Sequence, residues 1–325
     1  MAVDVIEAVS PVDALGRPTY VQLTRTGLAT LDISDMLLYS LVEFRGMGMA
    51  PLHRLTTRGP YQHGTSDRGY RLDPRPVYMV MHVHGESHGH MYEARQALFP
   101  YLRPGLDPVG IRFSYTGTDS VLVQRQIDCH MVRGMDGSTA DQRAWRQREV
   151  IELVANDPTF YDPTPSVRTL SLDGGGTGVT LSDLGAGTVT MKLGDPGGAD
   201  TPMAGGLGAG SLIVTMPEPA AWDTYPTISC YGPMTGLTIT NEATGDVIAI
   251  TGTIPNGDVW TIDLRFGYKT IRDAAGTNQI GGITSASSLA TFRLVPGTNN
   301  ITVSATGTSS ATLVKLTYYR RFLGV

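Results

Sequence analysis

The chain changes character between residues 150 and 165, which read VIELVANDPTFYDPTP. Ile151, Leu153 and Ala155 recur at every second position, a period typical of a half-buried strand. Three prolines then follow within eight residues, and each one lacks a backbone N–H and favours an extended conformation in the residue before it. We therefore predict that this stretch begins as a strand and ends as a stiff joint.

The chain on either side of the joint differs in composition, so we place a domain boundary there. The predicted domains are residues 1–163 and 164–325. Phe160 and Tyr161 lie between the prolines, and we expect them to hold the joint against a neighbouring surface.

Composition favours an all-β class. The 325 residues include 39 Gly and 20 Pro, which suit a chain with many turns, and the apolar fraction of 41% is enough for real cores. The net charge of −5 argues against nucleic-acid binding. Nearly all basic residues are Arg, which protein interfaces favour over Lys, although genome composition explains the same bias equally well.

The cysteines and the first residues of the chain indicate the cellular compartment in which the protein is made. Cys129 and Cys230 each lie in a strand-like run of a different predicted domain, so we expect both to be reduced and buried. No apolar run approaches the length of a membrane span, and we expect no membrane insertion. The start, MAVDVIE, lacks the basic region of a secretion signal, so we expect synthesis in a cytoplasm.

One helix stands out in the first domain, over Ser87 to Pro104. Ser87 suits an N-cap, and Met91, Ala94, Leu98 and either Tyr101 or Leu102 form an apolar stripe at helical spacing. Strands are expected around it. They cover residues 36–44, 76–85, 109–115 and 121–132.

Residues 53–75 are polar, rich in Arg and interrupted by Gly and Pro. We interpret them as a long exposed loop with short strand pieces. A loop of this length usually has a partner or a function.

The second domain shows short candidate strands separated by Gly, Asn and Asp, which is the signature of a β-sandwich. Residues 241–246 read NEATGD and predict a hairpin turn. The segment 173–210 is very rich in Gly, and we interpret it as thin strands with mobile loops. The expected strands cover residues 188–193, 211–216, 227–231, 237–241, 247–251, 259–264, 290–295, 300–305 and 313–322.

Four histidines, His82, His84, His88 and His90, are the best candidate for a metal site. Zinc needs three or four ligands that converge at about 2 Å. We prefer the alternative that strand alternation places these side chains outward. The Gly-rich runs match no nucleotide-binding fingerprint, and no Gly-x-Ser-x-Gly elbow is present. We predict no catalytic site, no cofactor and no metal.

The sequence resembles the distal tail proteins of long-tailed, non-contractile bacteriophages, and the resemblance spans most of the chain. It is carried by short motifs in a fixed order around the joint. They are RGPYQHGTSDRGY (58–70), RQIDCH (125–130), NDPTFYDP (156–163), YPTI (225–228), TITNE (238–242) and LRFGYKT (264–270).

The resemblance implies a mainly β protein with an N-terminal β-sandwich related to tail-tube proteins, one flanking helix, and a C-terminal galectin-like or jelly-roll sandwich. Six copies would close into a ring at the tail tip of the virion, assembled in the host bacterial cytoplasm. The ring would join the tail tube and tape-measure protein to the tail-tip hub or fibre proteins. DNA would only pass through its lumen, which we predict to be neutral or acidic.

A ring with head-to-tail contacts uses two different patches on each subunit. The Arg-rich segment is our candidate for one of these inter-subunit contacts. Its arginines are Arg54, Arg58, Arg68, Arg71 and Arg75.

The alternative function is carbohydrate binding at the tail tip, since galectin-like folds can present aromatic side chains for stacking on sugars. Trp222, in a loop flanked by Pro, and Tyr225 are the candidates. Trp260 alternates with Ile262 and Leu264, so we assign it to the core.

Overall fold

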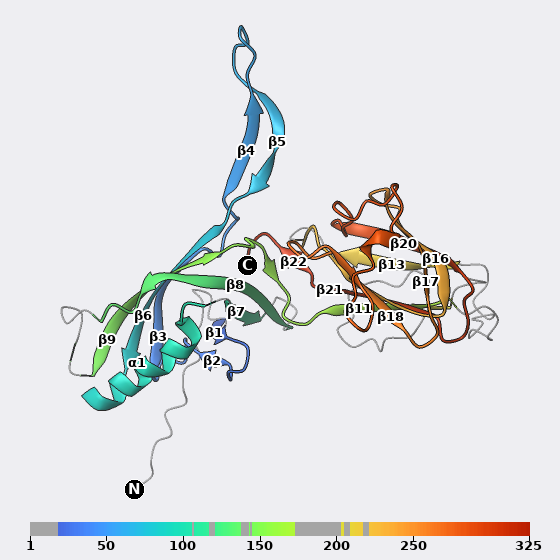
Figure 1. The fold of residues 1–325 in the computed structure, drawn as a ribbon. Helices are drawn as coiled ribbons and strands as arrows, with labels where there is room; N and C mark the ends of the chain where they lie inside the picture. Colours follow the sequence, from blue (N-terminus) through green and yellow to red (C-terminus); the bar gives the residue numbers. More distant parts are fainter. Residues whose placement is uncertain are drawn as a thin grey trace. The chain divides into compact units, whose positions relative to one another are not determined.

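The computed structural model describes residues 19–105, 107–116, 121–137, 143, 145–172, 203–204, 209–216 and 221–325. The chain divides into two compact units. Unit 1 contains the described residues up to Pro163 together with Phe322–Val325, and unit 2 is Thr164–Arg321. The last four residues, expected in the second domain, thus belong to unit 1. Both units are built mainly from strands, which confirms the predicted fold class (Figure 1).

Unit 1 holds two sheets that share a long, bent strand. One sheet has the order β3-β6-β9-β8, and the other β8-β7-β1-β2. The register of β8 shifts between Met131 and Arg133, where the strand passes into its pairing with β9. The strands are β1 (Thr19–Thr24), β2 (Leu31–Asp32), β3 (Tyr39–Arg45), β4 (Leu52–Thr57), β5 (Ser66–Leu72), β6 (Arg75–His84), β7 (Val109–Thr116), β8 (Leu122–Gly134), β9 (Arg146–Ala155) and β10 (Phe160–Tyr161).

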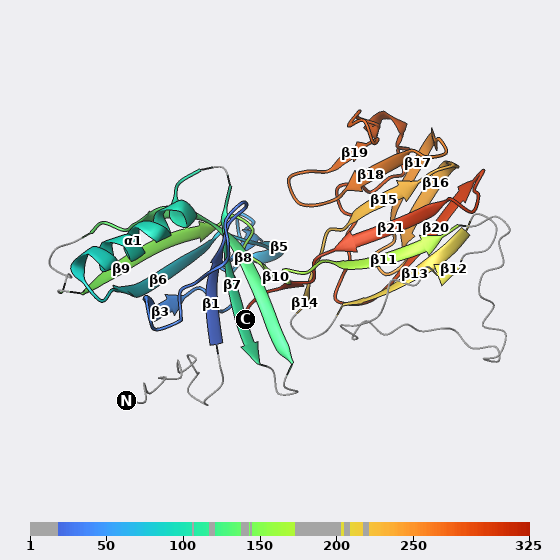
Figure 2. The same cartoon turned by 90° about the horizontal axis from the view of Figure 1, so that it is seen from below.

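Helix α1 (His88–Leu102) covers the core side of β6 and β9 (Figure 2). Ser87 caps it as predicted, because its Oγ accepts from the backbone N–H of His90 at 3.2 Å. The helix buries Met91, Ala94, Leu98 and Leu102, which share one face. The sequence prediction of this helix is confirmed.

The proline-rich stretch is packed into unit 1 rather than standing free of it. Phe160 is fully buried in the core of unit 1, 5.9 Å from the Phe113 ring centroid. The Tyr161 hydroxyl donates to Asp128 at 2.7 Å, and Asp162 forms an ion pair with Arg125. The two aromatic residues therefore hold this part of the chain in place as expected.

Unit 2 is a sandwich of two sheets around one core, as Figure 2 shows. The first sheet has the order β12-β11-β21-β15-β18-β19, and the second β13-β20-β16-β17. The elements are β11 (Ser166–Ser171), β12 (Met203–Ala204), β13 (Ala209–Met216), β14 (Ala221–Trp222), β15 (Thr227–Tyr231), β16 (Met234–Asn241), β17 (Asp246–Ile254), β18 (Val259–Asp263), β19 (Thr270–Arg272), the 3-10 helix η2 (Ile280–Gly282), β20 (Gly297–Thr306), β21 (Leu313–Tyr318) and β22 (Arg321–Phe322), which ends in unit 1.

Alternation explains the sandwich: β15, for example, turns Ile228 and Cys230 into the core. The predicted turn at 241–246 joins β16 to β17. The strand expected at residues 290–295 is wrong. Phe292 and Leu294 are instead buried in a stretch that follows a turn and is not a strand. Leu294 makes only an isolated bridge to Thr224. The galectin-like detail of this sandwich stays a prediction.

Two earlier expectations fall outside the described residues. They are the strand at 188–193 and most of the Gly-rich segment 173–210, of which only the pieces in β12 and at the start of β13 are described. Among the helices of the described part, none is long and apolar enough to cross a membrane.

Candidate interaction surface

Strands β4 and β5 form a two-stranded sheet of their own, which we call the arm. It is an antiparallel hairpin whose register runs from Leu52 opposite Leu72 to Thr57 opposite Ser66. Figure 1 shows it extending away from the other strands of unit 1. The predicted exposure and short strand pieces are present, but the two strands pair as one hairpin, which the prediction of a long loop did not include.

Local chemistry shapes the arm. At its tip, the Gly59 carbonyl accepts from the Gln62 N–H at 3.2 Å, and the Gln62 side-chain oxygen accepts from the Gly59 N–H at 3.0 Å. Further down, the register shifts between Arg54 and Thr56. Gly69 lies opposite this shift with φ +112°, a conformation that L side chains rarely adopt.

The arm exposes several large apolar side chains to solvent. Every residue of β4 is exposed. Tyr61 is 99% exposed and Tyr70 53%, and Leu52 and Leu55 are exposed as well. Isolated two-stranded hairpins are marginal in water, and clustered exposed apolar groups mark interaction sites. The arm is therefore the candidate interaction surface of unit 1.

Four of the five predicted arginines lie on the arm. Arg54 pairs with Asp67 at 2.9 Å, and Arg68 donates to the Thr57 hydroxyl at 3.1 Å. Arg58 donates to the Gln62 carbonyl at 3.1 Å, and Arg71 pairs with Asp73 at 3.3 Å. A guanidinium has five N–H donors, so these local contacts orient each fork and leave donors for a partner.

Arg75 does not belong with them, and its assignment as a surface contact is corrected by its burial. It begins β6 and is 1% exposed. Its guanidinium donates to the carbonyls of Pro158 at 2.7 Å, Gly46 at 2.6 Å, Leu323 at 2.7 Å and Gly48. Burial lowers the pKa of Arg75. Its role is to join three segments of unit 1 from within.

The four histidines do not converge. His82 and His84 lie on β6 with ring centroids 6.0 Å apart, whereas His88 and His90 lie in the first turn of α1. The His84 ring instead contacts the Ser40 hydroxyl at 2.8 Å. Among the described residues no group of three or more His, Cys, Asp or Glu is placed to hold a metal ion.

Trp222 and Tyr225 are both half-buried. Tyr225 packs against the core of unit 2, with the Lys269 ammonium 4.4 Å from its ring centroid and the Phe266 ring at 6.0 Å. Trp260 is 6% exposed and in the core, as predicted. The more exposed aromatic residue here is Phe266, at 75%. Sequence reasoning did not name Phe266 as a candidate. The available signal was that the buried alternation of Trp260, Ile262 and Leu264 does not continue to Phe266.

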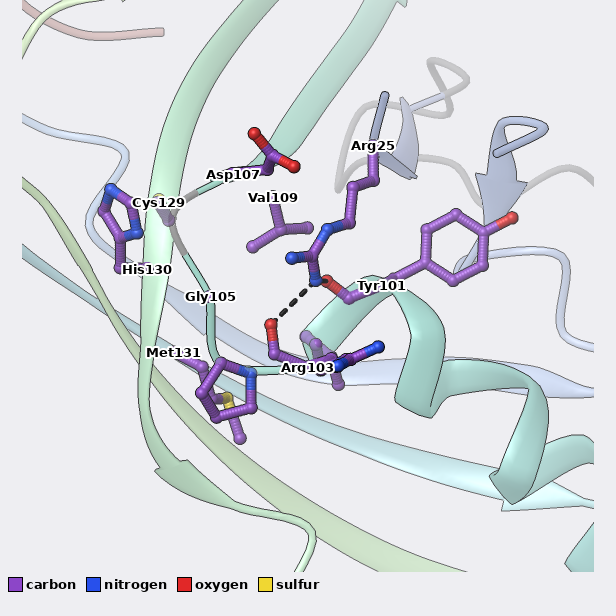
Figure 3. Close-up of a pocket in the computed structure, with 11 residues that line it drawn as sticks. Arg25, Tyr101, Arg103, Gly105, Asp107, Val109, Cys129, His130 and Met131 are labelled. Carbon is purple, nitrogen blue, oxygen red and sulfur yellow. Dashed lines mark hydrogen bonds between the residues drawn. The ribbon is translucent and has the colours of Figure 1, made fainter. Parts of the chain in front are cut away.

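A cavity of about 150 Å³ lies where α1 ends beside β8 (Figure 3). Arg25 extends into this region and donates to the carbonyls of Tyr101 at 3.0 Å and Arg103 at 2.7 Å, so it caps the helix C-terminus. Cys129 lines the cavity, and burial raises its pKa to about 12. A thiol with that pKa stays protonated at neutral pH, so it is not an activated nucleophile.

Comparison with known proteins agrees with the fold. Residues 220–322 match the family model described as the siphovirus-type tail component, C-terminal domain. The resemblance to distal tail proteins is confirmed. The crystal structure of the SPP1 Dit protein, described as a paradigm of the hub adsorption apparatus in phages that infect Gram-positive bacteria, is similar with a TM-score of 0.57 and 12% identity. It matches over 93% of this chain and 99% of the other.

Chains of the phage p2 baseplate in its activated conformation are also similar, in structures with Ca and with Sr. Their TM-scores are 0.49 and 0.47, each at 11% identity and covering 94% of this chain and 99% of the other. No curated protein matches the sequence. The similarity to the SPP1 Dit fold covers residues of both units, whereas all but the last residue of the family-model match, 220–322, lies in unit 2.

Proposed function

We propose that this chain is a structural protein of a phage tail, and that six copies close into a ring at the tail's distal end. The ring would join the tail tube and tape-measure protein to the tail-tip hub or fibre proteins. The tail-component match in unit 2 and the Dit-like fold support this role. We further propose that the protein is located in the virion tail and assembles in the host cytoplasm.

The arm is the observation that carries the ring. A closed ring needs two different complementary patches on each subunit. The arm offers one such patch, because it exposes tyrosine, leucine and arginine side chains on a ribbon that the rest of the described chain leaves uncovered. Tyr and Arg are the residues that interfaces favour. The chain's net charge of −5 supplies carboxylates with which a neighbour could meet the arginine forks.

The native mass of the purified protein tests this proposal. Six copies of a 34.8 kDa chain amount to about 209 kDa, the mass expected by light scattering for a closed ring. A variant with all four arm arginines changed to Gln should lose this mass but keep its circular dichroism spectrum. The arginines to change are Arg54, Arg58, Arg68 and Arg71.

A matched control changes four exposed arginines outside the arm to Gln, and it should keep the mass of the unaltered chain. The control arginines are Arg45, Arg103, Arg133 and Arg272. An unaltered chain that stays monomeric at all concentrations would contradict self-assembly. A ring that survives loss of the arm arginines would remove the arm from the interface.

Carbohydrate binding stays a separate prediction for Trp222 and Tyr225. Their half-buried state leaves part of each ring for stacking, but the Lys269 ammonium already occupies one face of Tyr225. A glycan array compared between the unaltered chain and Trp222→Ala tests it. Signals that persist in the variant, or no signals at all, would exclude this assignment.

A further inference from the structure

One face of the β6–β9 strand pair carries four basic side chains side by side. In the antiparallel register His82 lies opposite Arg148, and His84 lies opposite Arg146. Directly opposed residues project from the same side of a sheet, and successive residues alternate between sides. Val83, between the two histidines, is fully buried on the side that α1 covers. The four side chains, which we call the basic face, therefore point away from the core.

The basic face lacks the carboxylate partners that its neighbours have. On the same side of the sheet, Arg45 pairs with Glu43 at 2.5 Å, and Arg133 pairs with Glu152 at 2.6 Å. The two arginines of the basic face are exposed, and within the described part of the chain neither guanidinium has a hydrogen bond or an ion pair. Arg146 and Arg148 lie two residues apart on the same side of β9, so their positive charges repel each other. An anion bound between them would remove that repulsion.

Burial and the neighbouring positive charges lower the pKa values of both histidines. Burial lowers the pKa of His82 first, and then Arg146, His84 and Arg148 lower it further. The pKa of His84 is lowered by burial and then by Arg146, and Asp35 opposes this shift. Both rings are therefore neutral at neutral pH in the absence of an anion. A bound anion would favour their charged forms and raise both pKa values.

Apolar side chains border the basic face. Trp145 directly precedes Arg146 and is 62% exposed, and its carbonyl accepts from the Gly85 N–H at 2.9 Å. Leu37, which is 68% exposed, directly precedes Leu38, and the backbone N–H of His84 donates to the Leu38 carbonyl at 2.8 Å. Arginine beside exposed aromatic and aliphatic groups is the composition of a protein interface. This border favours an acidic polypeptide over a nucleic-acid backbone.

The chain itself contains a segment of matching chemistry. Residues 2–13 read AVDVIEAVSPVD, with three carboxylates, at Asp4, Glu7 and Asp13, and no basic residue. Apolar residues lie between them. The segment precedes the described residues, and its 12 residues reach about 40 Å when fully extended, enough to cross the face or to arrive from a neighbouring copy.

We propose that residues 2–13 bind the basic face, with carboxylates at Arg146 and Arg148 and apolar side chains against Trp145. The segment comes from the same copy or from an adjacent one. This binding does not require the proposed ring, because a single copy contains both partners.

The test is a peptide of residues 2–13 carrying a fluorescent label, titrated with the full-length chain at low salt and followed by anisotropy. The chain carries Asp4→Asn, Glu7→Gln and Asp13→Asn, so that its own segment does not compete. We expect saturable binding that weakens as salt increases. A peptide with the same three neutral substitutions should not bind.

The arginine variants place the site. Arg146→Gln with Arg148→Gln should weaken peptide binding at least tenfold, whereas Arg45→Gln, on the same side of the sheet but paired with Glu43, should change it less than twofold. Circular dichroism of each variant confirms folding, and replacing both arginines by Lys should restore part of the affinity.

Binding should also tighten as pH falls through the histidine pKa values, and His82→Gln with His84→Gln should abolish this pH dependence. Absence of peptide binding would overturn the proposal. So would equal affinities in the Arg146/Arg148 and Arg45 variants, or tighter binding of a 12-base-pair DNA duplex than of the peptide.

Discussion

Replacing Arg75 by Met tests how unit 1 is held together. Met keeps a long, flexible chain over the Phe160 ring, which lies 4.7 Å from the guanidinium carbon, but it donates no hydrogen bond. The carbonyls of Pro158, Gly46, Gly48 and Leu323 would each lose a donor.

At about 1 to 1.5 kcal/mol for each lost bond, the destabilisation sums to about 5 kcal/mol. Removal of a desolvated charge offsets about 1 kcal/mol or more of this. The net expectation is a loss of about 3–4 kcal/mol, which for a unit of this size lowers the melting temperature by about 10 °C.

Scanning calorimetry of the full chain measures the effect, because unit 2 contains none of the contacts of Arg75 and its transition serves as an internal reference. Arg45→Met is the matched control. Arg45 is a largely exposed arginine whose ion pair is with Glu43, and surface substitutions of this kind change stability by about 0.5 kcal/mol or less. A shift for Arg75→Met as small as that of the control would refute the structural role of the buried guanidinium.

Three further predictions concern buried groups. Burial outweighs the effect of Arg95 and raises the pKa of Glu149, so the folded chain binds a proton there more readily than the unfolded chain. The free energy of unfolding should therefore fall as pH rises from the ordinary Glu pKa through the raised one. Glu149→Gln should remove this pH dependence in urea titrations from pH 4 to 7. Burial raises the pKa of Cys129 and Cys230 to about 12 each, so iodoacetamide at pH 8 should modify neither until urea is added, and rapid native labelling would contradict their burial. Phe160→Ala should cost unit 1 about 3–5 kcal/mol in denaturant unfolding, and a cost under about 1 kcal/mol would show that the proline-rich stretch is not part of its core.

The parts of the fold that sequence could predict are those with short-range causes. Helix α1 is predictable because its cap at Ser87 and its stripe from Met91 to Leu98 are encoded within a few turns. Strand β15 is predictable from the alternation of Ile228 and Cys230. The pairing of the arm's two strands was not predictable, because a ribbon exposed on both faces has no apolar alternation that would set its register.

The structure divides the five predicted arginines into four on the exposed arm and Arg75, which is buried. Five arginines close in sequence look alike by composition, yet Arg75 is in register with Val77 and Met79, and this period-two pattern could have placed it on the buried side of β6. The basic face could not be found from the sequence. Its histidines and arginines are about sixty residues apart, and only the pairing register brings them together.

The return of the chain to unit 1 makes unit 2 an insertion. The chain leaves unit 1 after Pro163 and re-enters at Phe322, and β10 and β22, at the two ends of the insertion, are neighbouring strands of one sheet. A unit whose ends meet in this way can be exchanged for another by recombination while the host unit keeps its termini and its core. A short linker from Tyr161 to Phe322 would remove unit 2 and leave the two ends of unit 1 joined.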